Sequence, residues 1–196
     1  MRFCFPMACL AALLLPPVQA AEPVKAPALK NVIDYFLALP QEVLGVGGAS
    51  PAERRKLIDT EDLKNGYLHL SSGDWEGHGE VVLWRKPDKS FLLGVSIAHC
   101  GPVCGQHLKF FVHREGKLQE VTGEVWAGLS DEDITARYEK VARQKYADGE
   151  IPPTLVKLPR KGTALALVTQ AAFTDGEFTL ATWAFQGGKF VLQPGP

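Results

Sequence analysis

The sequence lacks an apolar run long enough to cross a bilayer, which takes about 20 residues of helix. Its longest apolar stretch, Phe3–Leu15, is shorter and is followed by Pro16-Pro17. An excess of one charge is also missing, because 21 Lys and Arg stand against 22 Asp and Glu. We therefore expect no transmembrane segment in the mature protein. The balance also predicts neither a nucleic-acid partner nor binding to an anionic membrane, since both favour clustered basic charge.

Two short basic runs, Arg54-Arg55-Lys56 and Arg160-Lys161, do not alter this balance, and we interpret both as solvated faces. Common catalytic motifs are missing as well. The sequence has no Gly-x-Ser-x-Gly elbow, no His-Glu-x-x-His zinc motif and no phosphate-binding loop. We predict no catalytic residue, no cofactor and no metal, which favours a protein that is not an enzyme.

The first 20 residues have the layout of a secretory signal peptide. Arg2 supplies the positive charge before the apolar stretch, and Val18-Gln19-Ala20 is a small-x-small cleavage site with Ala21 just beyond it. We expect residues 1–20 to be removed, residues 21–27 to form a flexible leader, and residues 28–196 to form a single α+β domain. The mature protein is then periplasmic or secreted.

Three segments have helical patterns. Apolar residues with helical spacing form one stripe over Leu29–Leu37, which ends before Pro40. Ser50-Pro51-Ala52-Glu53 is a capping box that begins a second helix. Ser130 precedes three acidic residues that favour the positive end of a third helix, and Tyr138 belongs to its buried side.

Segments with strand composition fill most of the remaining chain and are separated by turn residues. They are Tyr67–Leu70, Glu80–Trp84, Phe91–Ala98, His107–His113, Leu118–Val125, Thr154–Leu158, Thr163–Thr169, Phe178–Phe185 and Lys189–Leu192. The short connections predict antiparallel hairpins. The fold class we predict is α+β, with one antiparallel meandering sheet of about eight to nine strands, N-terminal helices and one inserted helix.

A repeat of spacing runs through these strands, and three hairpins also place a Lys just before the returning strand. Two triplets of large apolar residues share steps of 18 and then 7 positions, namely Leu93, Phe111 and Leu118, and Leu165, Trp183 and Phe190. The spacing has two interpretations. It indicates either a duplicated unit of three strands or a meander whose strands happen to have equal lengths.

Signal cleavage would leave two of the four cysteines, Cys100 and Cys104. They flank Gly101-Pro102-Val103, which has turn composition and lies between two apolar strands. A hairpin tip of this kind brings two Cβ atoms close to disulfide distance. In an oxidising compartment we predict a structural disulfide, which stabilises the fold by roughly 2 kcal/mol because its loop is so short.

Two other interpretations of this loop remain. Cys-Gly-Pro-Val-Cys resembles the redox motif of thioredoxin-like proteins, although it has one more intervening residue and is followed by a predicted strand rather than a helix. A metal site formed by His99, Cys100, Cys104 and His107 is the second interpretation. Strand alternation opposes it, because neighbouring residues His99 and Cys100 point to opposite faces.

Loop tips supply the candidate recognition residues. The segment Asp74–Glu80 combines carboxylates, an indole and an imidazole between glycines. It is interpreted as a polar hairpin loop, as a weak metal site or as a recognition tip anchored by Trp75. We predict a candidate recognition surface that includes Trp75, His78, His99 and His107.

Four segments of the sequence resemble those of a group of small secreted bacterial β-rich proteins of uncharacterised function. They are Tyr35–Pro40, Asp62–Leu68, Cys100–Cys104 and Leu158–Thr163. This resemblance implies an exported β-rich domain and no known activity. The cysteine loop is also similar to that of periplasmic inhibitors of vertebrate lysozyme, which present a Cys-bracketed loop with a His to the enzyme. The loop here is one residue shorter and holds no His between its cysteines.

These observations favour an exported, non-catalytic binding or envelope-accessory protein of unknown ligand. Its partner is then a protein or small molecule of the cell envelope. A thiol–disulfide redox protein that uses Cys100 and Cys104, and a protein of the lysozyme-inhibitor type, are the alternatives.

Overall fold

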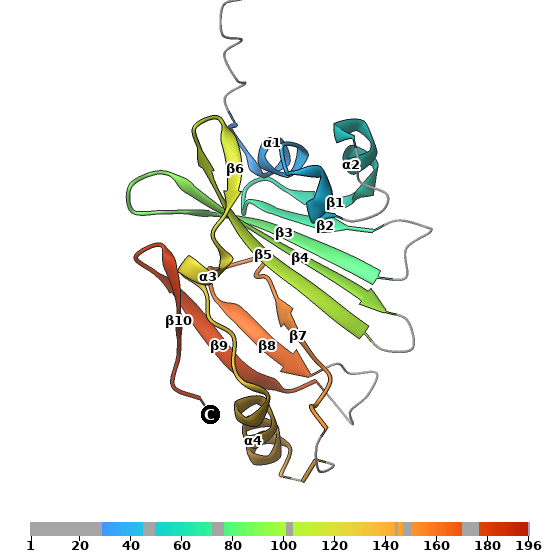
Figure 1. The fold of residues 1–196 in the computed structure, drawn as a ribbon, viewed down its shortest axis with the longest axis vertical. Helices are drawn as coiled ribbons and strands as arrows, with labels where there is room; N and C mark the ends of the chain where they lie inside the picture. Colours follow the sequence, from blue (N-terminus) through green and yellow to red (C-terminus); the bar gives the residue numbers. More distant parts are fainter. Residues whose placement is uncertain are drawn as a thin grey trace, which may run out of the picture.

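The fold consists of four layers, shown in Figure 1: two N-terminal helices, a six-stranded sheet, a four-stranded sheet and a helix that lies between the two sheets in the sequence. The α+β class predicted from the sequence is therefore confirmed. The computed structural model describes residues 29–44, 50–71, 77–100, 104–143, 145–146, 150–169 and 177–195. The predicted signal peptide, leader and cleavage site lie outside these residues, and so does Trp75.

The larger sheet is an antiparallel meander whose strands pair in chain order. Its strands are β1 (Ile58–Asp62), β2 (Tyr67–Leu70), β3 (Gly77–Arg85), β4 (Phe91–Cys100), β5 (Cys104–Arg114) and β6 (Lys117–Glu120). Strand β1 has a polar sequence and lies at the margin of the sheet, which explains why hydrophobic patterning did not predict it. The predicted strand Leu118–Val125 ends at Glu120, and the chain continues into the short helix α3 (Thr122–Val125).

The smaller sheet is a second antiparallel meander, with strands in the order β10-β9-β8-β7. Its strands are β7 (Thr154–Lys157), β8 (Leu165–Thr169), β9 (Thr179–Gln186) and β10 (Lys189–Leu192). The prediction of one continuous sheet of eight to nine strands is therefore wrong. The chain leaves the first sheet after β6 and passes through α3 and α4 (Asp131–Ala142), so β7 begins a new sheet instead of pairing with β6.

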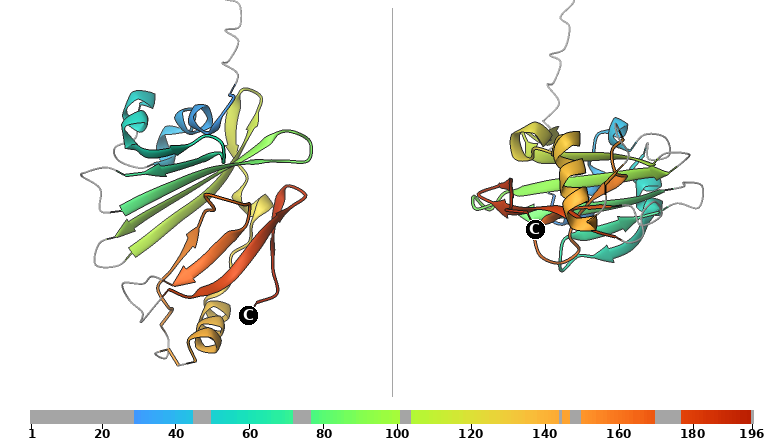
Figure 2. Two further views of the ribbon diagram at one scale, coloured as in Figure 1. Left: turned by 180° about the vertical axis from the view of Figure 1, so that it is seen from behind. Right: turned by 90° about the horizontal axis from the view of Figure 1, so that it is seen from below.

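The second and third predicted helices begin at their predicted capping residues, whereas the first begins at Val32, three residues after the predicted start at Leu29. Asn31 Oδ1 accepts hydrogen bonds from the backbone of Ile33 and Asp34 and caps α1 (Val32–Leu37). The capping box of Ser50 and Glu53 is present at the start of α2 (Pro51–Leu57). Ser130 caps α4, which lies across the outer face of the smaller sheet in the view from below in Figure 2. A short 3-10 helix, Gln41–Val43, follows α1.

The larger sheet is buried on both faces, which explains the continuous apolar sequence of β4. One face packs against α1 through residues that include Phe36, Leu93 and Phe111. The other face packs against the smaller sheet through a cluster that includes Trp84 and Trp183. A strand covered on both sides has no solvated face and therefore does not alternate.

Aromatic rings fill the space between the two sheets. The Trp84 ring lies 6.0 Å from that of Phe110, 6.0 Å from Phe185 and 5.1 Å from Phe190, measured between ring centroids. A Cβ at position 94 would lie 2.6 Å from Trp84 Cζ3, so the indole can lie against β4 only because Gly94 has no side chain. Trp84 Nε1 also donates to Thr163 O at 3.0 Å.

Polar contacts also join the two sheets. Gln106 of β5 donates from Nε2 to Val156 O at 2.7 Å, and its Oε1 accepts from Val156 N at 2.8 Å. Glu80 Oε2 accepts from Leu158 N at 2.9 Å, while Glu80 Oε1 accepts from the Tyr67 hydroxyl at 3.2 Å. Burial, followed by the neighbouring Glu80 charge, raises the pKa of Tyr67 to about 12.

The repeat of spacing corresponds to a repeat of strand pairing. Leu93 pairs with Phe111 and Leu165 pairs with Trp183. Leu118 pairs with His113, two positions after Phe111. In the same way, Phe190 pairs with Phe185, two positions after Trp183. Both hairpins turn through two residues of positive φ, Glu115-Gly116 and Gly187-Gly188, as type I′ turns require. The two triplets nevertheless face different layers, α1 for the first and the larger sheet for the second.

Candidate binding site

Five turns from the two sheets meet at one end of the molecule. Antiparallel meanders place alternate turns at the same end, so residues 63–66, 86–90 and 115–116 share one end of the larger sheet. Residues 158–164 and 187–188 share one end of the smaller sheet. The two ends are in contact, because a Cβ on Gly188 would lie 3.0 Å from Lys86 Cε.

These turns and the strand residues beside them carry nine of the chain's 21 Lys and Arg side chains. We call this group the basic end; it consists of Lys64, Arg85, Lys86, Lys89, Arg114, Lys117, Arg160, Lys161 and Lys189. The same turns and adjoining strand residues carry three acidic residues, Asp62, Asp88 and Glu115. The chain as a whole has a formal charge of −1, so folding separates charge that the sequence distributes evenly.

Three of the nine cations have acidic partners. Arg160 Nε donates to Asp62 Oδ2 at 3.1 Å, and Lys86 Nζ lies 3.5 Å from Asp88 Oδ2. Arg114 lies 3.9 Å from Glu124. Within the described part of the chain the other six make no ion pair and remain available to an external anion.

The acidic partners at this end are held in their charged form. Hydrogen bonds from Asn65 and then from Arg160 keep the pKa of Asp62 below its ordinary value. Hydrogen bonds from the side chain and backbone of Ser90 lower the pKa of Asp88. Their charges offset only part of the positive potential, since six cations have no such partner.

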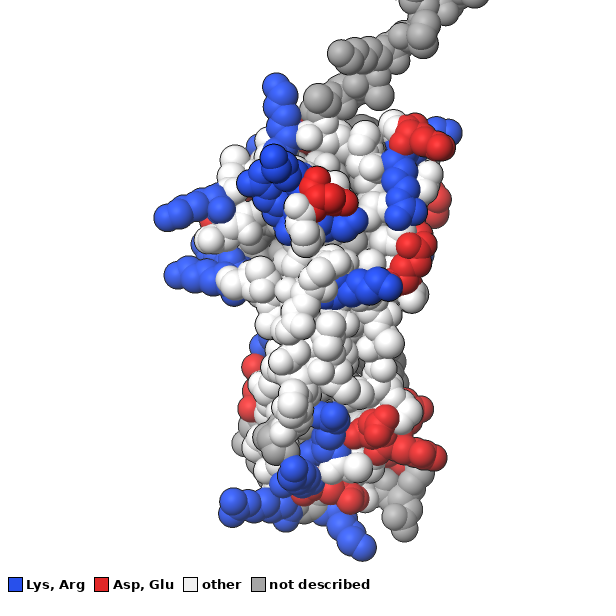
Figure 3. All heavy atoms as spheres, turned by 90° about the vertical axis from the view of Figure 1, so that its left-hand side faces the viewer, with Lys and Arg blue, Asp and Glu red and all other residues white. Residues whose placement is uncertain are grey.

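Figure 3 shows the face of the molecule from which the hairpins project. Lys and Arg side chains gather over its upper half, with one acidic cluster among them and further Asp and Glu along the right-hand edge, and a largely uncharged band lies below. An apolar side chain accompanies the cations, because Leu63 is 52% exposed and directly precedes Lys64. Arg160 and Lys161 are both exposed to solvent, as the sequence predicts, and both belong to the basic end.

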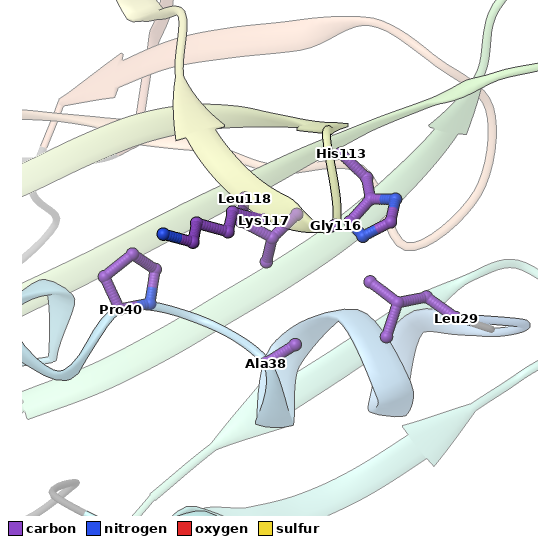
Figure 4. A pocket seen from close by; sticks show the side chains of 7 residues that line it. All are labelled: Leu29, Ala38, Pro40, His113, Gly116, Lys117 and Leu118. Atoms are coloured by element: carbon purple, nitrogen blue, oxygen red, sulfur yellow. The ribbon is translucent and has the colours of Figure 1, made fainter. Parts of the chain in front are cut away.

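A cavity of about 350 Å³ lies beside the basic end, between α1 and the β5–β6 hairpin. Figure 4 shows the residues that line it, which are Leu29, Ala38, Pro40, His113, Gly116, Lys117 and Leu118. The rings of Tyr35 and His113 are in T-shaped contact, with 6.4 Å between ring centroids. The cavity is mainly apolar, and the charged group among its lining residues, Lys117, belongs to the basic end.

The predicted recognition histidines lie at the opposite end of the larger sheet and do not form one surface. The rings of His99 and His107 are in edge contact, with centroids 5.9 Å apart, and both side chains are exposed. His78 pairs with Ala98 whereas His107 pairs with Ile97, so His78 points to the other face of the sheet. There it stacks on His69, whose Nδ1 lies 3.2 Å from Asp59 Oδ2.

The backbone places Cys100 directly opposite Cys104 in the β4–β5 ladder. Their side chains lie outside the described part of the structure, so the disulfide stays a prediction. In the residues that the structure describes, no group of three His, Cys, Asp or Glu side chains is arranged to hold a metal ion. None of the described helices has the length and hydrophobicity needed to span a membrane.

The pairing of Cys100 with Cys104 leads to a redox prediction. We expect the pair to have a reduction potential below about −300 mV, as structural disulfides do. Redox titration with alkylation and intact-mass measurement on protein exported to the periplasm would measure it. A potential near −200 mV or higher would instead favour the thiol–disulfide redox interpretation.

Sequence reasoning missed the basic end and the cavity because both depend on which turns meet. Nine cations from five separate turns leave no long basic run in the chain. The one local signal was the Lys that precedes the returning strand in three hairpins, namely Lys89, Lys117 and Lys189. The cavity has no local signal, since α1 and the β5–β6 hairpin are far apart in sequence.

The fold and site define a small α+β protein with two meandering antiparallel sheets and a cationic end. No family model matches the chain, and no curated protein matches it. Among solved structures, it is similar to a domain of an uncharacterised protein from Porphyromonas gingivalis W83, with a TM-score of 0.55 and 16% sequence identity. The likeness covers 84% of this chain and 99% of that chain. The chain thus shares the fold of a β-rich domain from an uncharacterised bacterial protein.

Proposed function

We propose that the protein is an exported, non-catalytic protein of the cell envelope that binds the surface of an anionic lipid membrane through its basic end. The observation that carries this proposal is the gathering of nine cations against three acidic residues on five adjoining turns and the strand residues beside them. The signal-peptide pattern of residues 1–20 and the resemblance to small secreted bacterial proteins support export. An exported protein of this kind would work in a compartment bounded by membranes.

The physical case rests on charge and on one apolar side chain. Each Lys or Arg close to an anionic membrane surface contributes about 1 kcal/mol of binding free energy, and this attraction decays within a Debye length of about 8 Å at physiological salt. Six unpaired cations at one end are therefore enough for reversible attachment. Leu63, exposed among them, provides an apolar group that can enter the interface between headgroups and acyl chains.

Vesicle sedimentation tests the proposal. We expect the protein to sediment with vesicles of phosphatidylglycerol and phosphatidylcholine and to stay in solution with pure phosphatidylcholine. Lys64→Glu together with Lys189→Glu should lower the partition coefficient at least about tenfold, since two attractive charges become repulsive. Raising the salt concentration should have the same effect on the wild type.

A matched control carries the same change of net charge away from the basic end. Lys56→Glu together with Lys145→Glu reverses two exposed lysines of α2 and of the segment after α4. This variant should sediment within about twofold of the wild type, because neither residue lies near the membrane in the proposed orientation. Equal losses in the two variants would show that net charge, and not the basic end, governs attachment.

A further inference from the structure

We infer that the cavity between α1 and the β5–β6 hairpin binds one molecule of an anionic alkyl amphiphile, a long-chain carboxylate, with its chain in the cavity and its acid group at Lys117. This site goes beyond membrane attachment. It would hold a single ligand molecule in solution, and its lining is separate from the basic end and its turns apart from Gly116 and Lys117.

The shape and lining of the cavity suit a hydrocarbon chain. Its volume of about 350 Å³ lies within the range of ligand pockets, about 300–1,000 Å³. Ala38, Pro40 and Leu118 supply apolar walls, and Leu29 closes one side. Ala38 is exposed and Leu29 and Pro40 are half-buried, so water contacts an apolar surface that an alkyl chain would cover.

The charges around the cavity select an acid rather than a base. Lys117 Nζ has no acidic partner within the described residues, and no Asp or Glu is among the residues that line the cavity. In Figure 4 the Lys117 amino group lies beside Pro40, and the His113 ring lies towards Leu29. The cavity therefore has a cation at the Lys117 end and an apolar surface between Lys117 and His113. This arrangement matches a carboxylate that carries an extended alkyl chain.

Isothermal titration of the full chain with dodecanoate, below its micelle concentration, tests the inference. We expect one molecule of dodecanoate to bind per chain. It should bind at least about tenfold more tightly than dodecyltrimethylammonium, because the positive headgroup of that amphiphile would be repelled by Lys117. Failure to bind dodecanoate would overturn the inference. Equal affinity for the two amphiphiles would overturn the role of Lys117.

Two variants locate the ligand. Ala38→Phe places a ring in the cavity and should weaken dodecanoate binding at least about tenfold, whereas Ala52→Phe, at an exposed alanine of α2, should not change it. Lys117→Met should weaken dodecanoate binding about fivefold and leave the affinity for dodecanol unchanged. Unchanged binding by Ala38→Phe would show that the ligand sits elsewhere.

The same variants separate this site from membrane attachment. Ala38→Phe should retain vesicle binding, because it adds no charge to the basic end. Lys64→Glu with Lys189→Glu should retain dodecanoate binding, because neither residue lines the cavity. Loss of both activities in either variant would contradict two separate sites.

Discussion

Replacing Trp84 with alanine is expected to lower the free energy of unfolding by about 4 kcal/mol. Trp84 is 3% exposed and lies at the centre of the cluster that joins the two sheets. Its removal leaves a cavity bordered by Phe110, Phe185 and Phe190, and β-strands on both sides prevent that cavity from collapsing. The substitution also leaves Thr163 O without its donor.

Denaturation in urea, followed by circular dichroism, would measure this loss. Trp84→Phe keeps an aromatic ring and removes the donor, so it should cost only about 1.5 kcal/mol. Leu63→Ala, at a side chain that is 52% exposed, should change stability by less than about 0.5 kcal/mol. A loss below about 1.5 kcal/mol for Trp84→Ala would mean that the two sheets do not depend on this contact.

The second large effect is expected at Arg54, a cation that the sequence places in a basic run. We interpreted that run as a solvated face, and for this residue the interpretation is wrong, because Arg54 is 3% exposed. Its Nη1 donates to Leu37 O at 2.9 Å and to Leu39 O, the carbonyls at the end of α1. Burial lowers its pKa, which the nearby charge of Glu42 partly offsets.

Arg54→Ala should therefore cost about 3 kcal/mol of unfolding free energy, because two carbonyls lose a charged donor and the apolar stem of Arg54 is removed. Arg54→Met retains most of the stem and isolates the hydrogen bonds, so its cost should be smaller by about 1 kcal/mol. Urea denaturation compares the two variants. A Met variant as stable as the wild type would show that packing alone holds α1 against α2.

The elements that could be predicted are those fixed by neighbouring residues. Ser50 and Glu53 cap α2 through contacts only three residues apart, and the short turn at Glu115-Gly116 sets the register of β5 and β6. Arg54 shows the limit of such reasoning. Its burial depends on carbonyl groups 15 and 17 residues away, which a local charge pattern does not report.

The division into two sheets could not be predicted for a similar reason. The strands from Thr154 onward have the same composition as those before Glu120, and patterning does not say whether β7 pairs with β6 or begins a new sheet. The contacts that decide it, from Gln106 to Val156 and from Glu80 to Leu158, are made by polar side chains across 50 and 78 positions. The basic end follows from that same arrangement.

The hydrogen bonds of Gln106 have one more consequence. Strand β7 is the outermost strand of its sheet, and an unpaired strand edge is a template on which other chains can aggregate. The amide of Gln106 satisfies both the N–H and the C=O of Val156, and Glu80 satisfies the N–H of Leu158. Gln106 and Glu80 thus take the place of a neighbouring strand along this part of the edge and oppose intermolecular β-sheet growth there.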